Sequence, residues 1–227
     1  RRFEEVGANF SNDSLRDMAI ASLRTLKEPD LMDQALDTFA TVIAEPTFPE
    51  GAIERERRRV LIALQNQKQS PGEIAEKSFY RALYREHPYA IPPIGTEESV
   101  KALTREDLLE HYRRYYVGSN AVVAIVGHLE REDAEKVAER VVGKLPAGEA
   151  AEPLPEVTSL EEDERIGIEF PSAQTHIRIG QPGMRRGDPD YFPLYVGNHV
   201  LGGGGLVSRI SEEIREQRGL AYSAYSY

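Results

Sequence analysis

The chain has 227 residues, of which 40% are apolar and 8% aromatic, enough to bury the core of one large domain or two smaller ones. Its 28 basic and 38 acidic residues give a formal charge of −10, the wrong sign for binding a phosphate backbone, so nucleic acid is not an expected partner. The absence of cysteine excludes disulfides and thiolate metal sites. No apolar run approaches the roughly 20 residues of a membrane span. We therefore expect a soluble globular protein, and a start at Arg1 is expected of a processed precursor or an excised fragment.

Several stretches show apolar side chains at helical spacing. The first helix is expected to begin at Asp30, which follows Pro29 and is a good N-cap. In the second predicted helix, the charge run 54–59 is interpreted as a solvated face with ion pairs between residues four positions apart. Thr104 and Asp107 resemble a capping box at the start of the fourth. The predicted helices span residues 30–43, 50–64, 74–84, 104–112, 134–141 and 188–200.

Three regions indicate strands. Residues 120–126, NAVVAIV, form a continuous apolar run that is typical of a buried central strand. Residues 165–170 and 174–180 alternate apolar and polar side chains around a Pro-Ser-Ala turn, which predicts a hairpin. Aromatic and small residues at 220–227 predict a final strand. Residues 146–163, rich in Pro, Glu and Ala without periodicity, are predicted to be a linker.

The stretch 201–227 combines turn chemistry, a helix pattern and candidate site residues. Apolar residues at spacings of three and four predict a short amphipathic helix that ends at Gly219, where a left-handed cap fits. Arg215 and Tyr222 lie seven residues apart across that turn, so a chain reversal can direct both side chains to one place. The apolar residues of the pattern are Val207, Ile210 and Ile214.

Other kinds of site have weaker support. The glycine run 202–205 lacks the Gly-Lys-Ser/Thr ending of a phosphate loop and follows a predicted helix, so a turn that lets backbone approach a partner or substrate is preferred. Its candidate substrate-binding residues are Gly203, Gly204 and Gly205. The five histidines are at least seventeen residues apart and form no pair of zinc ligands. Ser208 has no triad context.

The order of short motifs along nearly the whole chain resembles the M16 family of zinc metallopeptidases, which includes pitrilysin, insulin-degrading enzyme and mitochondrial processing peptidase. The resemblance implies an α+β fold of the LuxS/MPP-like type, with two homologous domains that each pack a mixed sheet against helices. Residues 1–145 match the later part of the first domain, 146–163 the linker and 164–227 the opening part of the second. Both domains would be incomplete, so pairing between chains is expected. The motifs are Glu45-Pro46, Phe48, 53–56, 87–89, Gly95-Thr96, Leu103-Thr104, Tyr115-Tyr116, 122–127, Asn198, 201–203, Ser208-Arg209, Arg215 and 219–222.

The same resemblance implies that this chain holds no zinc. Active members bind the metal through a His-x-x-Glu-His motif and a later Glu, and the motif does not occur in this sequence, though it would precede Arg1 in a fragment. The Glu that lies seven positions before the later ligand matches Glu56, which places the ligand position at Ala63. A methyl group cannot bind zinc, and Gln65, two positions further, offers only a neutral amide. A zinc ion is therefore expected on a partner subunit, and the chain alone is expected to be inactive.

Arg215 and Tyr222 match the Arg/Tyr pair with which the second domain, or the non-catalytic subunit, of these enzymes reaches the zinc-bearing half. The implied roles are to hold substrate carbonyls and to donate to the developing oxyanion; from spacing alone, a solvated arginine and a packed tyrosine are preferred. The expected partners are a peptide and a zinc-bearing subunit in a heterodimer, or a homo-oligomer, in bacterial cytoplasm or periplasm. Two alternatives stay open: a structural subunit like respiratory-complex core proteins, and a fragment of an active peptidase whose metal motif lies upstream.

Overall fold

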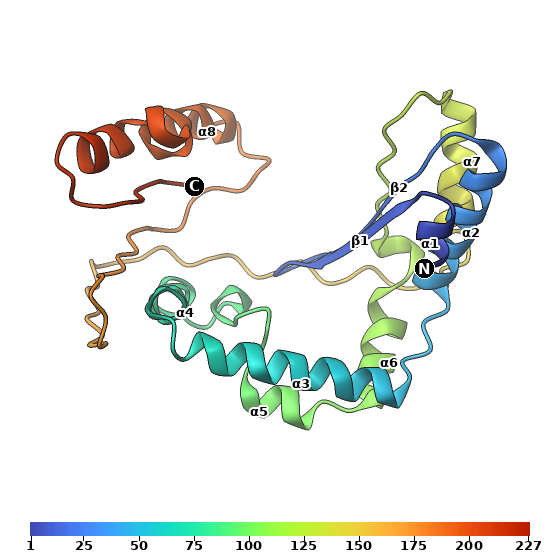
Figure 1. The fold of residues 1–227 in the computed structure, drawn as a ribbon, viewed down its shortest axis with the longest axis horizontal. Helices are drawn as coiled ribbons and strands as arrows, with labels where there is room; N and C mark the ends of the chain where they lie inside the picture. The colour runs from blue at the N-terminus through green and yellow to red at the C-terminus, as the bar shows by residue number, and fades with distance from the viewer. The chain divides into compact units, whose positions relative to one another are not determined.

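The computed structural model describes residues 1–227 and divides them into two compact units, Arg1–Gly180 and Gln181–Tyr227. No helix in it has the length and apolar character needed to cross a membrane. The first unit contains α1 (Arg2–Glu5), β1 (Asn9–Ser14), β2 (Ala19–Arg24), α2 (Pro29–Ala44), α3 (Glu50–Gln67), α4 (Pro71–Tyr84), η1 (Pro88–Ala90), α5 (Glu97–Ala102), α6 (Arg105–Tyr115), η2 (Gly118–Asn120) and α7 (Arg131–Val142). The second contains α8 (Tyr191–Asn198), η3 (His199–Gly203), η4 (Gly205–Val207) and η5 (Ser211–Glu216) (Figure 1).

Helix starts follow local capping chemistry. The predicted capping box is confirmed: the Thr104 hydroxyl accepts from the Asp107 N–H at 3.2 Å, and the Asp107 carboxylate accepts from the Thr104 N–H at 2.7 Å. The predicted N-cap Asp30 is wrong, because α2 begins two residues earlier with Glu28 as its N-cap. Pro29 occupies the first helical position, where its missing N–H leaves no hydrogen bond unmade and its fixed φ suits the helix.

The main core lies where α2, α7 and the base of the β1–β2 hairpin meet. Leu36 and Phe39 of α2 pack against Val141 of α7, and α7 confirms the helix predicted at 134–141. Arg140 joins the same two helices by ion pairs with Asp33 and Asp37. Partly buried side chains that close this core are Phe3, Phe10, Leu23, Met32, Ile43, Val137 and Val142.

The sheet differs from the one predicted. Its only two strands are β1 and β2, antiparallel with Asn9 opposite Arg24 and Ser14 opposite Ala19, and the sequence analysis had assigned no structure there. The predicted strands at 120–126 and 220–227 and the predicted hairpin at 165–180 are wrong, because none of these segments is in a strand. Val122 is 94% and Val126 100% exposed, so the apolar run 120–126 is not a buried central strand.

These segments fail as strands because a strand needs a neighbour to pair its N–H and C=O groups, and neither β1 nor β2 pairs with them. Residues 174–180 lie along α4 instead of folding back on 165–170. Residues 176, 178 and 180 contact α4, and each meets the helix about one turn beyond the contact of the one before it. These contacts join His176 to Gly72, Arg178 to Glu76 and Gly180 to Phe79.

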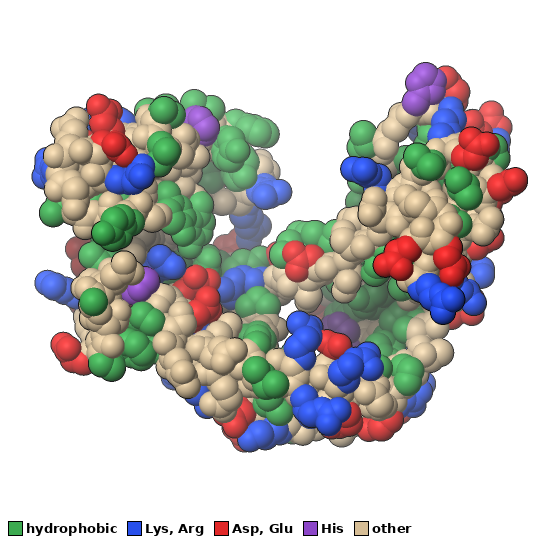
Figure 2. Space-filling model, in the orientation of Figure 1, with side chains coloured by type: hydrophobic (Ala, Val, Ile, Leu, Met, Phe, Trp, Pro, Cys, Tyr) green, Lys and Arg blue, Asp and Glu red, His purple; other side chains and the backbone are tan.

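The charge run on α3 is mostly solvated, and Figure 2 shows basic and acidic side chains interspersed over α3 and α5. Arg57 is the exception, with a side chain only 16% exposed. Its guanidinium donates to the carbonyls of Val100 and, at 2.7 Å, Leu103 at the end of α5. These carbonyls have no partner within the helix, so a residue predicted to be solvated instead caps α5.

A latch formed by Arg16 and Asp17 ties the hairpin tip to the loop after α4. The Arg16 guanidinium donates to the carbonyls of Tyr89 at 2.6 Å and Ile91 at 3.0 Å, and it lies 4.0 Å from the centroid of the Tyr80 ring. The Tyr89 hydroxyl donates to the Asp17 carboxylate at 2.6 Å, and that bond raises the pKa of Tyr89. Because β1 and β2 have few buried side chains of their own, this latch helps to fix the hairpin.

In the second unit, a close approach between Gly202 and Ser226 holds the last residues against η3. A Cβ added to Gly202 would lie 2.5 Å from the Ser226 backbone nitrogen, closer than any real contact. Gly197 of α8, five residues earlier, has nothing within 4 Å of the same position. The absence of a side chain at Gly202 therefore permits the close packing of Ser226, whereas at Gly197 it permits no contact.

Arg16→Ala is expected to loosen the hairpin, because it removes two hydrogen bonds from a charged donor and the contact with the Tyr80 ring. We expect the amides of β1 and β2 to exchange with deuterium about 5- to 30-fold faster, corresponding to ~1–2 kcal/mol. Hydrogen–deuterium exchange read by mass spectrometry measures this. Arg24→Ala, an exposed position of the same hairpin, is the control, and equal exchange in the two variants would contradict the latch.

Gly202→Ala is expected to displace the chain end, because the new methyl group overlaps the Ser226 backbone, and overpacking of this kind destabilises by roughly 1–3 kcal/mol. Limited proteolysis should then release residues 220–227 faster than in the parent. Gly197→Ala adds the same methyl group to open space within a helix, where alanine is favoured by about 0.5–1 kcal/mol. Equal cleavage of both variants would show that the close approach does not hold the segment.

Candidate functional site

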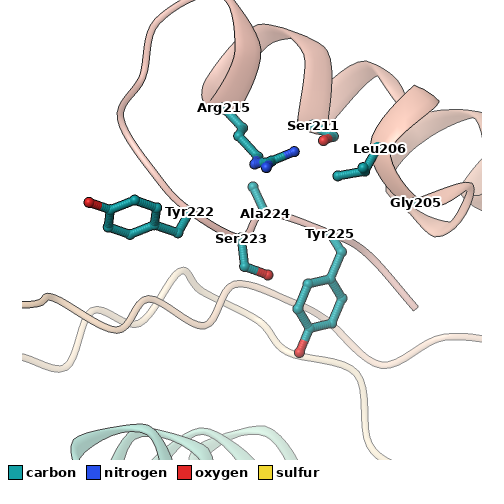
Figure 3. Close-up of a pocket in the computed structure, with 8 residues that line it drawn as sticks. All are labelled: Gly205, Leu206, Ser211, Arg215, Tyr222, Ser223, Ala224 and Tyr225. Atoms are coloured by element: carbon teal, nitrogen blue, oxygen red, sulfur yellow. The ribbon is translucent and has the colours of Figure 1, made fainter.

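Arg215 and Tyr222 line one cavity of about 290 Å³ in the second unit (Figure 3). The other residues that line it are Gly205, Leu206, Ser211, Ser223, Ala224 and Tyr225. Helical turns from 205 to 216 supply one wall, and the extended chain from 222 to 225 supplies the other. The structure therefore brings the two predicted site residues to the same cavity.

Gly219 produces the chain reversal between the two walls, as predicted. Its φ is +60°, and its N–H donates to the Arg215 carbonyl at 3.1 Å, while the Leu220 N–H donates to the Ile214 carbonyl at 2.9 Å. This pair of bonds resembles a Schellman motif widened by one residue, and it satisfies carbonyls at the helix end. The helix η5 is a π-helix: the Gln217 N–H donates to the carbonyl of Glu212, five residues earlier.

The two side chains do not point at one another. Figure 3 shows the Arg215 guanidinium directed between Ser211 and Ala224, whereas the Tyr222 ring points outward from the cavity. The Arg215 side chain is 37% exposed and Tyr222 is 89% exposed. The phenol is therefore open to a molecule that approaches from outside this unit.

Arg215 is the only charged residue that lines the cavity. Its Nη1 donates to the Glu216 carboxylate at 2.7 Å, and Glu216 is not part of the lining. Ser211, Tyr222, Ser223 and Tyr225 also line the cavity, and of these Tyr222 directs its hydroxyl away from it. The site can thus offer hydrogen-bond donors to an electron-rich group, with one fixed cation among them.

Of the candidate glycines, only Gly205 lines the cavity, with φ at +69°. Gly203 and Gly204 pack against the chain's own atoms: a Cβ on Gly204 would lie 2.9 Å from the His199 carbonyl oxygen. Tyr225 and Ser223 also line the cavity and are not among the residues predicted from the sequence. The signal that points to them is the run AYSAYSY at 221–227, which continues directly from Tyr222.

The residues of α3 do not fit a zinc site. Glu56 and Ala63 lie seven residues apart and so share one face of the helix, but the methyl group of Ala63 supplies no ligand atom. The Glu56 carboxylate instead accepts from Arg59 Nε at 2.6 Å, a bond that lowers the pKa of Glu56. Across residues 1–227 no three His, Asp or Glu side chains come together in a way that could hold a metal ion.

The histidines are likewise dispersed. His87 is buried and uses both ring nitrogens: Nδ1 accepts from the Tyr89 N–H at 3.1 Å, and Nε2 lies 3.0 Å from the Pro155 carbonyl oxygen. His176 packs against the first turn of α4 beside Gly72. Both are explained by packing within the first unit.

A second cavity of about 540 Å³ lies between the end of α6 and residues 146–152. Its outer wall is pinned to η2: the Ser119 hydroxyl donates to the Gly148 carbonyl at 2.8 Å, and the Ala151 N–H donates to the Asn120 side chain at 2.7 Å. Glu149 and Glu152 line it together with Arg113 and Arg114, so the cavity has no single charge sign. The beginning of the predicted linker is thus an ordered part of the first unit.

Comparisons with known proteins identify the family that this chain matches. Residues 1–97 match the family model of insulinase (peptidase family M16), and residues 102–227 match that of the peptidase M16 inactive domain. An uncharacterised zinc protease of Bacillus subtilis, YmxG, is 27% identical over 99% of this chain and 54% of its own length. A non-peptidase homologue of Helicobacter pylori, also named YmxG, is 29% identical over 98% of this chain and 51% of its own length.

Among solved structures, a peptidase M16 inactive domain from Pseudomonas fluorescens superposes with a TM-score of 0.91 at 39% identity. That match covers 99% of this chain and 54% of the solved chain. The chain thus spans about half the length of the relatives it matches. Its mixture of helices with a small two-stranded sheet is an M16-like fold, and since the inactive-domain model alone matches more than half of its residues, this chain belongs to peptidase family M16.

Proposed function

We propose that this chain is the non-catalytic part of an M16 peptidase and helps a zinc-bearing partner to bind peptide and stabilise the transition state. The observation that carries the proposal is that Arg215 and Tyr222 line one cavity while the zinc-ligand position on α3 is Ala63. The match of residues 102–227 to an inactive-domain model supports it. In this proposal the partner carries the zinc ion and the general base, and the pair forms a heterodimer.

The side chains suit these roles chemically. Apart from the Nη1 that donates to Glu216, the N–H groups of Arg215 make no hydrogen bond, so they can donate to a substrate carbonyl. The Tyr222 hydroxyl is exposed and can donate to the oxyanion that forms when water attacks that carbonyl. The outward direction of the phenol supports a role on a substrate that another chain helps to hold.

Of the candidate substrate-binding residues Gly203, Gly204 and Gly205, the proposal places only the backbone of Gly205 beside the bound peptide, because the other two pack against the chain's own atoms. Gly205 has the clearest support, because it lines the cavity. We also propose that residues 1–145 and 164–227 are parts of two M16-type domains joined by residues 146–163. A structural subunit without proteolytic role is the second candidate, favoured by the non-peptidase description of the Helicobacter pylori relative.

Tyr222→Phe is expected to slow peptide cleavage by a complex of this chain with its zinc-bearing partner, because the phenol donor to the oxyanion is lost. Loss of one such donor lowers kcat by roughly 100- to 1,000-fold. Steady-state cleavage of a fluorogenic peptide measures the effect. Tyr195→Phe removes a hydroxyl from another exposed tyrosine, on α8, and should leave kcat unchanged. Unchanged kcat in Tyr222→Phe would eliminate the Tyr222 role.

The purified chain is expected to retain far less than one zinc ion per molecule after incubation with zinc and dialysis, because the ligand position on α3 is Ala63 and no three His, Asp or Glu side chains come together to hold a metal ion. Elemental analysis of the protein measures the metal content directly. A stoichiometric zinc ion that survives dialysis would overturn the argument from Ala63.

A further inference from the structure

We propose that the cavity beside Arg215 selects peptides that carry a carboxylate, from an acidic side chain or from the peptide C-terminus. This inference rests on the proposed function, in which the cavity handles peptide, and it names the chemical class that the cavity prefers. Its basis is the sign of the charge that lines the wall.

The lining contrasts with the rest of the protein. The chain as a whole has a formal charge of −10, yet no Asp or Glu lines this cavity and its one charged residue is Arg215. Two of the three acidic residues of η5 are engaged elsewhere, because Glu213 pairs with Arg218 and Glu212 accepts from Gln217, while Glu216 accepts from Arg215 Nη1. A substrate carboxylate that enters the cavity therefore meets one cation and no lining carboxylate, although Arg215 Nη1 also donates to Glu216 outside the lining.

Most N–H groups of Arg215 remain available for hydrogen bonds. A guanidinium carries five N–H groups in a planar fork that matches the two oxygens of a carboxylate. Glu216 occupies only Nη1, at 2.7 Å, and Figure 3 shows the guanidinium directed into the cavity beside Ser211. Because the Glu216 contact is exposed and between neighbours in sequence, it contributes little that a substrate carboxylate could not replace.

The size of the cavity limits what it can accept. A volume of about 290 Å³ lies at the lower limit of ordinary ligand pockets, so it fits one side chain or one chain end and not a folded domain. Leu206, which is exposed, and Ala224 supply apolar surface beside the cation. This combination suits the methylene stem and the carboxylate of a glutamate.

The test uses fluorescein-labelled decapeptides that differ only at one central position, Glu or Gln, each with a free or an amidated C-terminus. Fluorescence anisotropy with this chain alone gives each Kd. Because the contact is charge-assisted but partly exposed, we expect the Glu peptide to bind on the order of tenfold more tightly than the Gln peptide at low salt, and less so at high salt. A free C-terminus that raises affinity equally would identify the chain end as the source.

Arg215→Gln should remove the preference for carboxylate, whereas Arg218→Gln should keep it, because Arg218 lies outside the lining and pairs with Glu213. Equal affinity of the Glu and Gln peptides with amidated and free ends, loss of the preference in Arg218→Gln, or no binding of any peptide would each overturn the proposal. The kcat of Tyr222→Phe in the reconstituted peptidase tests the proposed function separately. If the Glu and Gln peptides bind equally but Tyr222→Phe still cleaves slowly, the carboxylate preference is wrong and the proposed function stands.

Discussion

The close approach of Ser226 to Gly202 is the contact on which the candidate site depends. The segment 222–225 forms one wall of the cavity, yet no sheet pairs with it and its side chains are largely exposed. What keeps it against the helical wall is backbone packing at Gly202, supported by a long hydrogen bond of 3.4 Å from the Ser226 hydroxyl to the Asn198 carbonyl. Gly202 therefore helps to form the cavity although it does not line it.

The electrostatics of the cavity follow from the same local geometry. Ser211 and Arg215 reach the lining from the inner side of η5, while Glu212, Glu213 and Glu216 do not. Glu212 and Glu213 find partners in Gln217 and Arg218, whereas Glu216 accepts from the cavity cation itself. An acidic chain can thus keep one positively charged site by the orientation of a single helix.

Local chemistry made the helices predictable, and the need for a neighbour made the strands unpredictable. The Thr104 capping box and the stop at Gly219 use only residues within one turn, and both are present. The run 120–126 has the composition of a buried strand, but composition does not supply a paired neighbour, and Val126 is fully exposed. The hairpin at 9–24 was missed for the opposite reason: its faces are mostly exposed, so its sequence lacks a clear apolar alternation.

For the site, the sequence located the residues but not their directions. Arg215, Gly219 and Tyr222 could be placed near one another because a left-handed glycine between a helix and an extended chain reverses direction within a few residues. Whether a phenol then turns inward depends on packing by residues such as Ser211 and Tyr225, which no short motif specifies. The outward direction of Tyr222 leaves its phenol open to a molecule outside this unit, and the proposed function depends on that exposure. In the proposed function Ala63 agrees with this direction, because the zinc ion and the attacked carbonyl would then be held by the partner, and an exposed Tyr222 could reach them there.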